Sequence, residues 1–186
     1  MKRLNADNFP SSPSPAKGRG LDRATFEVLY QRHGRRAKGF FLRMMDYDEA
    51  LADDLTQELF LRIWKHRGEY NADGSFETWL FTIAYNLCKN EYRHQNAVRG
   101  CVETLSQRPE PSTDPVQDLE RKEQKALIRQ AVQRLPEGQR EAFILRYEED
   151  LPLADVAAIL AIPEGTVKSR LFGALNAVRK ALNDDE

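Results

Sequence analysis

Side chains that could contact nucleic acid gather near the C-terminus, in the segment PEGTVKSRLFGALNAVRK (residues 163–180). The back of this segment is apolar, and its first half carries hydroxyl groups, cations and an aromatic ring: Thr166, Lys168, Ser169, Arg170 and Phe172. Hydroxyls and cations of this kind bond phosphates or base edges, and an aromatic ring packs on a thymine methyl group. The segment therefore indicates either a helix that reads DNA or a basic helix on a solvated face.

The residues before this segment favour the DNA-reading interpretation. The stretch LADVAAILAIPEGTVKSRLF fits a helix-turn-helix, with Ala157 as the small side chain where the two helices cross. Ala161 stands at the turn, where the backbone tends toward positive φ. Pro163 suits the first helical position, and Glu164 lies against the positive end of the helix dipole. A recognition helix presents its N-terminal turns to the major groove, which is where the polar residues lie.

The charge balance limits how the chain could hold DNA. It carries 28 basic and 29 acidic residues, a net charge of −1, whereas a protein that holds DNA by itself is usually basic. This balance argues against an autonomous, tight DNA binder and fits a reader that a larger partner delivers to DNA. No apolar run approaches the roughly 18 residues of a membrane span, and the first residues lack the apolar core of a secretory signal. We expect a cytoplasmic protein without membrane insertion.

The residue types that support catalysis or metal binding are scattered. Cys88 and Cys101 form no CxxC motif, and His33, His66 and His94 belong to no metal-binding pattern. We therefore expect no metal and no cofactor. The two thiols are expected to be buried or incidental, and the alternative that they form a redox-sensing pair stays open. The sequence has no P-loop, no triad-like grouping and no glycine-rich phosphate cradle. We therefore expect no catalytic residues and no enzymatic activity.

Two breaks divide the chain into two domains, and the pattern between them is helical almost throughout. Residues 1–20 are rich in proline and serine and predict a disordered N-terminal arm. Residues 97–117 are again rich in Pro, Ser and Thr and predict a flexible linker. The sequence thus predicts an all-α protein with two small helical domains, residues 21–96 and residues 118–186. It leaves open how the two domains are oriented and whether they hide each other's DNA-binding faces.

Three apolar stripes predict three helices in the first domain. The first stripe includes Phe26 and Tyr30, and the third helix also carries a polar ridge. Ser75 is the expected N-cap of this third helix. Opposite the core side of that helix, polar residues recur at helical spacing: Thr78, Thr82, Tyr85, Asn86, Lys89 and Arg93. Together with Tyr70 and Asn71 in the preceding loop, this ridge suits a phosphate track with a captured base. The alternative is an ordinary polar outer face.

As a set, these residues resemble a known family. The block DDLTQELFLRIWKHRGEYNADGSFETWLFTIAYNLCKNEYRH resembles region 2 of extracytoplasmic-function (ECF) sigma factors, the small group of the sigma-70 family. The block LPEGQREAFILRYEEDLPLADVAAILAIPEGTVKSRLF resembles their region 4. The resemblance covers nearly all of residues 21–182. It implies a three-helix region 2 and a four-helix region 4, and an alternative sigma factor that directs core RNA polymerase to promoters through their −10 and −35 elements.

The resemblance also implies roles for individual residues. Residues that match the contact with the clamp coiled coil of the largest polymerase subunit are Asp54, Gln57, Glu58, Phe60, Leu61 and Trp64. Residues that match −10 recognition and melting are Tyr70, Asn71, Thr78, Trp79, Thr82, Asn86, Lys89 and Arg93. The −35 element would be read by the five polar and aromatic residues of the recognition helix. Region 4 would also meet the polymerase flap, and an anti-sigma factor would occupy these same surfaces.

The chain departs from the family pattern at three positions. Tyr85 stands where many relatives have Arg, and Gly173 and Leu175 replace two cations that commonly follow the recognition helix. Fewer phosphate contacts would weaken −35 binding, unless Arg179 and Lys180 compensate.

Two other functions remain as alternatives: a stand-alone helix-turn-helix regulator bound to an operator, and an adaptor or inhibitor that binds polymerase but has lost promoter reading.

Overall fold

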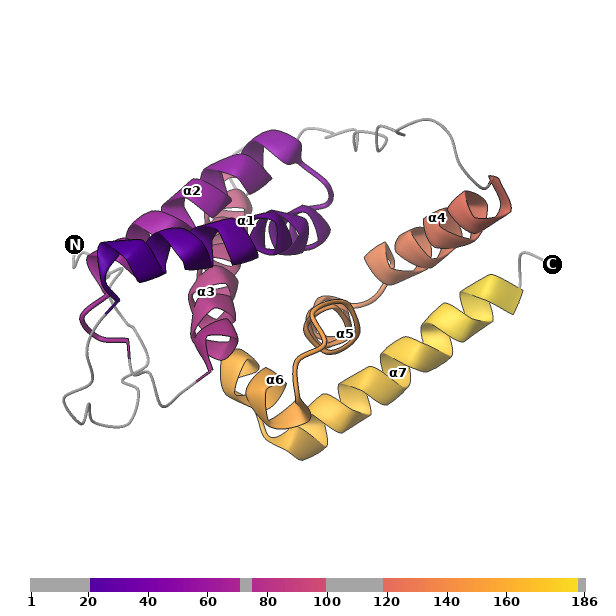
Figure 1. Cartoon of the computed structure of the whole chain (residues 1–186). Helices are drawn as coiled ribbons and strands as arrows, with labels where there is room; N and C mark the ends of the chain where they lie inside the picture. Colours follow the sequence, from indigo (N-terminus) through magenta and orange to yellow (C-terminus); the bar gives the residue numbers. More distant parts are fainter. Residues whose placement is uncertain (1–20, 71–74, 100–118, 184–186) are drawn as a thin grey trace.

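The computed structural model describes residues 21–70, 75–99 and 119–183, and these form helices without any strand. Figure 1 shows the helices in chain order: α1 (Arg23–Met44), α2 (Glu49–Lys65), α3 (Phe76–Arg99), α4 (Leu119–Gln133), α5 (Glu137–Phe143), the π-helix η1 (Ile144–Glu148), α6 (Leu153–Leu160) and α7 (Glu164–Asn183). The all-α prediction, with three helices followed by four, is confirmed. The predicted arm and most of the predicted linker lie outside the described residues, and α3 runs three residues beyond its expected end at 96.

Short polar side chains fix where the first three helices begin. The Asp22 carboxylate accepts the Thr25 backbone N–H at 2.7 Å, and Asp48 accepts the backbone N–H of Leu51 at 2.9 Å. The predicted cap of α3 is present in a longer form, since the Ser75 hydroxyl lies 3.4 Å from its backbone N–H partner three residues on. Each cap satisfies one of the orphan N–H groups at a helix start. No helix among the described residues is long and apolar enough to cross a membrane.

In the second helical unit, residues 119–183, prolines mark where three of the helices begin. Pro136, Pro152 and Pro163 directly precede α5, α6 and α7. The sequence placed Pro163 at the first helical position, whereas α7 begins one residue later and the Pro163 carbonyl accepts the N–H of Val167 at 3.1 Å. Its fixed φ still prepares the helical direction, and no N–H is lost there because proline has none to leave unpaired.

The turn of the helix-turn-helix has the predicted left-handed backbone. Ala161 has φ 53° and ψ 45° at the end of α6, and the backbone N–H of Ile162 reaches the Ala157 carbonyl at 3.1 Å. This bond closes the end of the helix in the manner of a left-handed cap. An L-residue with a Cβ is strained in this region, whereas glycine is not.

Ala161→Gly is therefore expected to raise the free energy of unfolding by about 1 kcal/mol. The measurement is a urea unfolding curve of the full chain, in which the midpoint rises at an unchanged slope. Ala158→Gly is the matched control, because Ala158 is exposed inside α6 and glycine there costs about 1 kcal/mol. Equal shifts for both variants would contradict the strain at the turn.

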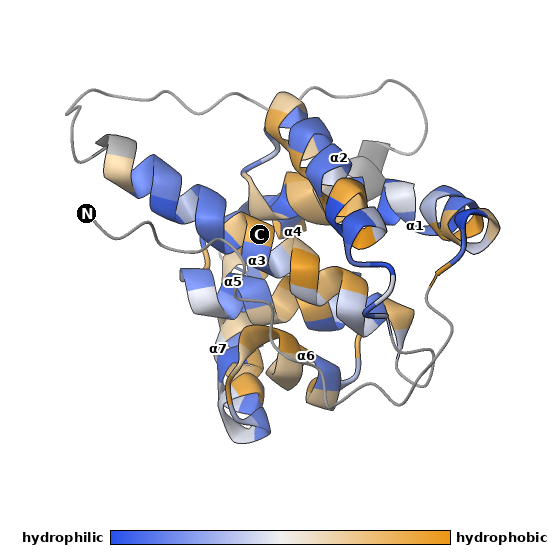
Figure 2. Cartoon of the chain, turned by 90° about the vertical axis from the view of Figure 1, so that its left-hand side faces the viewer, coloured by the Kyte–Doolittle hydropathy of each residue, from blue (hydrophilic) through white to orange (hydrophobic). Residues whose placement is uncertain are grey.

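The two helical units share one hydrophobic core. Buried residues of α1 and α3 and buried residues of the second unit form a single cluster. Figure 1 shows α6 beside the N-terminal half of α3, and Figure 2 shows hydrophobic residues toward the middle, where α3, α5 and α6 meet. The orientation that the sequence left open is thus a close packing of the second unit against α3.

Candidate functional site

A groove between α1 and α2 brings together four of the six residues predicted to bind polymerase. Its lining residues come from both helices: Arg23, Phe26, Glu27, Tyr30, Gln57, Phe60, Leu61 and Trp64. The Phe26 and Trp64 ring centroids are 5.0 Å apart, and those of Tyr30 and Phe60 are 4.7 Å apart. Leu61 is 64% exposed at this groove. An exposed leucine beside aromatic rings that contact each other is typical of a protein-binding surface.

The other two predicted residues lie outside the lining of the groove. Asp54 is exposed on α2, one turn before Gln57. The Glu58 carboxylate accepts a hydrogen bond from Arg62 Nε at 2.6 Å, so it is already engaged within its own helix. The α1 wall of the groove was missed by sequence reasoning, which assigned Phe26 and Tyr30 to the core stripe. Tyr30 is 46% exposed, and only the packing of α1 on α2 shows that it faces the groove.

The polar ridge of α3 is not the free outer face that the sequence predicted. The Thr78 hydroxyl donates to Asp155 of α6 at 2.9 Å, and Tyr85 is only 7% exposed. Burial raises the pKa of the Tyr85 hydroxyl. Lys89 Nζ lies 5.6 Å from the centre of the Tyr85 ring, while Arg93 remains exposed. The second unit therefore covers the N-terminal and middle parts of the ridge, and its C-terminal end stays accessible.

Thr82 and Asn86 lie between these contacts and are half-buried. The Thr82 hydroxyl donates back to the Thr78 carbonyl at 2.7 Å, which occupies its proton within the helix. Both residues are therefore partly accessible at the surface of the ridge.

An aromatic cluster stands where α3 begins. The Tyr70 ring lies 5.3 Å from the Trp79 ring and 5.7 Å from the Phe76 ring, measured between centroids. On the other side His33 of α1 lies 5.2 Å from Phe76, and burial lowers the pKa of that histidine. The cluster joins Tyr70 to the first turn of α3. Asn71, which was predicted together with Tyr70 to form a base-capturing loop, lies outside the described residues.

The helix α7, which was predicted to be the recognition helix, presents most of its predicted residues to solvent. Lys168 and Ser169 are exposed, and Phe172 is 69% exposed. Thr166 is half-buried, and its carbonyl accepts the Ser169 hydroxyl at 3.0 Å. The outward face thus carries a cation, a hydroxyl and an aromatic ring, as predicted.

Arg170 is the exception, because its guanidinium group turns toward α5. It lies 3.9 Å from a Glu141 carboxylate oxygen and packs over Gly138, where an added Cβ would come within 2.9 Å of Arg170 Cζ. Glycine at position 138 is what permits this approach. Glu141 is only 5% exposed, and burial raises the pKa of its carboxyl group.

The two departures from the family pattern on α7 have different surroundings. Gly173 faces Gln139 of α5, whose Nε2 would lie 2.9 Å from an added Cβ. Leu175 is 37% exposed and adds to the apolar surface near Phe172. Arg179 and Lys180, the cations that could compensate, are exposed in the last turns of the same helix.

Thiol and metal chemistry find no support in the described part of the chain. Cys88 is fully buried and unpaired, and burial raises the pKa of its thiol, which keeps it in the unreactive protonated form. Cys101 lies outside the described residues. No group of three or more potential metal-ligating side chains occurs within residues 21–70, 75–99 and 119–183.

Comparisons with known proteins agree with this arrangement. A family model described as Sigma-70 region 2 matches residues 29–118, and one described as Sigma-70, region 4 matches residues 125–178. The RNA polymerase sigma-H factor of Pseudomonas aeruginosa is 32% identical over 180 residues, which cover 87% of this chain and 88% of that protein. The ECF RNA polymerase sigma factor SigW of Bacillus subtilis is 32% identical over 143 residues, 72% of this chain and 76% of the relative.

Solved structures with the same fold include a sigma factor bound to an anti-sigma factor. The sigma factor RpoE in complex with the anti-sigma factor NepR, from Bartonella quintana, is 26% identical with a TM-score of 0.65, covering 87% of this chain and 98% of that one. The structure of CnrH in complex with the cytosolic domain of CnrY has the same TM-score at 23% identity, covering 89% and 92%. The similarity to CnrH shows that the two chains share a fold.

Proposed function

Because the chain belongs to the extracytoplasmic-function group of the sigma-70 family, we propose which of its surfaces perform that family's task. It is an alternative sigma factor, a transcription initiation subunit that binds core RNA polymerase and directs it to promoters. We assign residues 21–96 to region 2, residues 97–117 to the linker and residues 118–186 to region 4. We further assign it to the cytoplasm, where polymerase works.

The α1–α2 groove is the proposed contact with the polymerase clamp coiled coil. The observation that carries this assignment is Leu61, a large apolar side chain that is 64% exposed in a groove walled by aromatic rings. Burying such a side chain against a partner helix removes apolar surface from water. Asp54 and Gln57 on the same side of α2 supply polar groups for the rim of the interface.

Two other surfaces are proposed to read DNA. The −10 element would meet the aromatic cluster of Tyr70 and Trp79 and the α3 ridge from Thr78 to Arg93. The −35 element would meet the outward face of α7, where Lys168 bonds a phosphate and Phe172 packs on a base edge. Duplex opening would draw on binding energy alone, without catalytic residues and without a cofactor. The near-neutral net charge fits a subunit that polymerase brings to DNA.

An anti-sigma factor is the proposed regulatory partner. The structurally similar sigma factor RpoE forms a complex with the anti-sigma factor NepR. A similar inhibitor would be effective on this chain if it covered the α1–α2 groove or the face of region 4 that meets the polymerase flap. Such binding would compete with core polymerase.

The test of the proposed function is run-off transcription with purified core RNA polymerase on a library of genomic fragments. We expect new discrete start sites that depend on this protein, with shared −10 and −35 sequences upstream. Co-elution with polymerase without new starts would favour the adaptor alternative. If the protein neither produces new start sites nor co-elutes with polymerase, that result would contradict the assignment of the groove and of both DNA-reading surfaces.

A further inference from the structure

The helices α5 and α7 cross at close range, because each presents a glycine to the other. Gly138 of α5 faces Arg170 of α7, and an added Cβ at position 138 would come within 2.9 Å of Arg170 Cζ. Gly173 of α7 faces Gln139 of α5 in the same way, with 2.9 Å between an added Cβ and Gln139 Nε2. Glycine allows such an approach because it has no Cβ. The cation that the family pattern leads one to expect at position 173 would push the glutamine aside.

The side of α7 that meets α5 lies next to its outward face. Arg170 and Gly173 are three residues apart, and residues at that spacing share one side of a helix. Leu171 is buried on the core side, whereas Lys168 and Phe172 are exposed on the outward side. Because the three sides belong to one rigid helix, a rotation of α7 against α5 would turn the outward side as well.

The Arg170 guanidinium lies beside a buried carboxylate and a backbone carbonyl of α5. Glu141 is buried, and Arg170 Nη1 lies 3.9 Å from one of its carboxylate oxygens. The same nitrogen donates to the Gly138 carbonyl at 3.5 Å. A buried carboxylate is costly unless a positive group accompanies it. We refer to Gly138 and Glu141 together as the arginine seat, since one leaves the space for the guanidinium and the other requires its charge.

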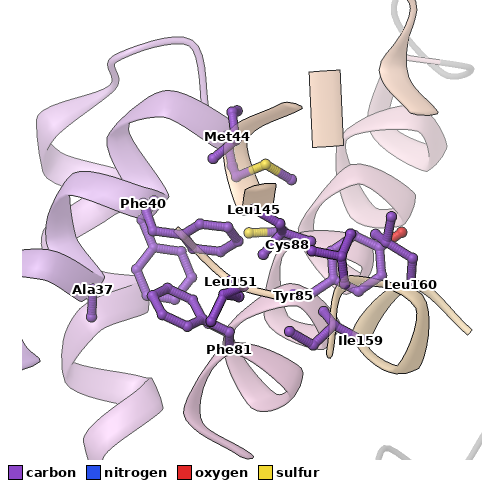
Figure 3. Close-up of a cluster of buried hydrophobic side chains, with 14 of the residues drawn as sticks. Ala37, Phe40, Met44, Phe81, Tyr85, Cys88, Leu145, Leu151, Ile159 and Leu160 are labelled. Atoms are coloured by element: carbon purple, nitrogen blue, oxygen red, sulfur yellow. The ribbon is translucent and has the colours of Figure 1, made fainter. Parts of the chain in front are cut away.

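The opposite side of the Glu141 carboxylate faces the hydrophobic core. It is hydrogen-bonded to the hydroxyl of Tyr85 on α3, and Figure 3 shows Tyr85 in the same buried cluster as Ile159 and Leu160 of α6. Burial raises the pKa of the Tyr85 hydroxyl, so this group stays neutral. A neutral phenol cannot balance a carboxylate. The positive charge of Arg170 therefore has a function at the seat that does not involve DNA.

We propose that Arg170 is a positioning residue that acts through α5 and contacts no DNA: the arginine seat fixes the rotation of α7. This rotation directs Lys168 and Phe172 outward, and their role at the −35 element rests on the proposed function. Sequence reasoning grouped Arg170 with these readers because it lies among them along the helix. The contacts of the guanidinium with the seat lie within α5 and α7, so they belong to the second helical unit alone.

Gly138→Ala tests this proposal because it displaces the guanidinium without changing any charge. The new Cβ would meet the end of a flexible side chain, so the core can stay packed, and alanine favours a helix over glycine. We therefore expect the urea unfolding midpoint to equal or exceed that of the wild type. Holoenzyme should nevertheless bind promoter DNA about tenfold more weakly, a loss comparable to one base contact. If Arg170 reads DNA, the substitution releases it toward the DNA, and affinity stays equal or rises.

Gly34→Ala is the matched control for this substitution. Gly34 also lies inside a helix, α1, and an added Cβ there meets nothing within 4 Å. We expect its promoter affinity to stay within about twofold of wild type, as for most exposed substitutions. Titration of labelled promoter DNA with each holoenzyme measures the affinities, and a parallel titration with core polymerase should show no difference between the two variants.

Arg170→Gln completes a double-mutant cycle with Gly138→Ala. Because each substitution alone empties the seat, the double variant should bind promoter DNA no more weakly than the weaker single variant. The slope of log affinity against log salt should be the same in all three variants. A phosphate contact by Arg170 would instead lower this slope by about one unit in Arg170→Gln and leave it unchanged in Gly138→Ala.

The outcomes separate the positioning role from the proposed function. Equal promoter affinity of Gly138→Ala and Gly34→Ala, additive losses in the double variant, or the split of salt slopes would overturn the positioning role and leave the sigma-factor assignment standing. Wild-type holoenzyme that binds no promoter DNA would reject the proposed reading surfaces instead. Hydrogen exchange in the free chain would then decide on the seat, because its loss should speed exchange of the α7 amides in Gly138→Ala. Exchange equal to that of Gly34→Ala would overturn it.

Discussion

Leu61→Glu is expected to weaken binding of the chain to core RNA polymerase by about a hundredfold, equivalent to about 2.7 kcal/mol. Leu61 is the most exposed large apolar side chain at the α1–α2 groove, with 64% of its surface free. If it inserts between side chains of a partner helix, the substitution removes apolar burial and places an unpaired carboxylate in a desolvated contact. Fluorescence anisotropy of labelled protein titrated with core polymerase measures the change directly.

Val28→Glu is the matched control for this prediction. Val28 is 65% exposed on α1 and does not line the groove, so the same charge enters an equally exposed apolar position. We expect its affinity for core polymerase to stay within about twofold of wild type. Both variants should keep the stability of the wild type, because exposed substitutions usually change the free energy of unfolding by less than about 0.5 kcal/mol. An equal loss of affinity for both would reject the groove as the polymerase contact.

Lys168→Glu is expected to reduce initiation from promoters that depend on a −35 element by at least about tenfold, with core polymerase binding unchanged. Lys168 is exposed on the outward face of α7 and forms no ion pair with another residue that the structure describes. A cation that contacts a phosphate releases a counterion, so its removal lowers the slope of log affinity against log salt by about one unit. Reversing the charge adds repulsion to that loss. Holoenzyme binding to promoter DNA over a salt series gives both the affinity and the slope.

Lys180→Glu distinguishes the two accounts of the missing cations on α7. Lys180 lies on the same helix, is also exposed, and undergoes the same change of charge. If the outward face around Lys168 and Phe172 does the reading, Lys180→Glu leaves initiation nearly unchanged. If Arg179 and Lys180 compensate for Gly173 and Leu175, the salt slope falls for Lys180→Glu as well. Normal initiation by Lys168→Glu would contradict the recognition-helix assignment altogether.

The sequence alone determined the helices, the helix-turn-helix and which side of α7 faces outward, because the signals for all three are local. Apolar residues at three- and four-residue steps define which side of a helix is buried, and capping residues such as Ser75 mark where it begins. The left-handed backbone at Ala161 was likewise predictable, since a turn between two short helices imposes it. The exposure of Lys168 and Phe172 follows from their places on the amphipathic α7 helix.

Only the tertiary structure decided what the polar and apolar faces contact. Arg36 and Glu149 are 113 residues apart in sequence, and periodicity says that a face is buried or polar without naming its partner. The α3 ridge was therefore expected to be an outer face, whereas the second unit buries Tyr85 within it. Tyr30 was expected in the core, whereas it forms a wall of the groove. Contacts between distant elements depend on shape and charge that assemble only when the helices pack, and this packing set both the open groove and the covered ridge.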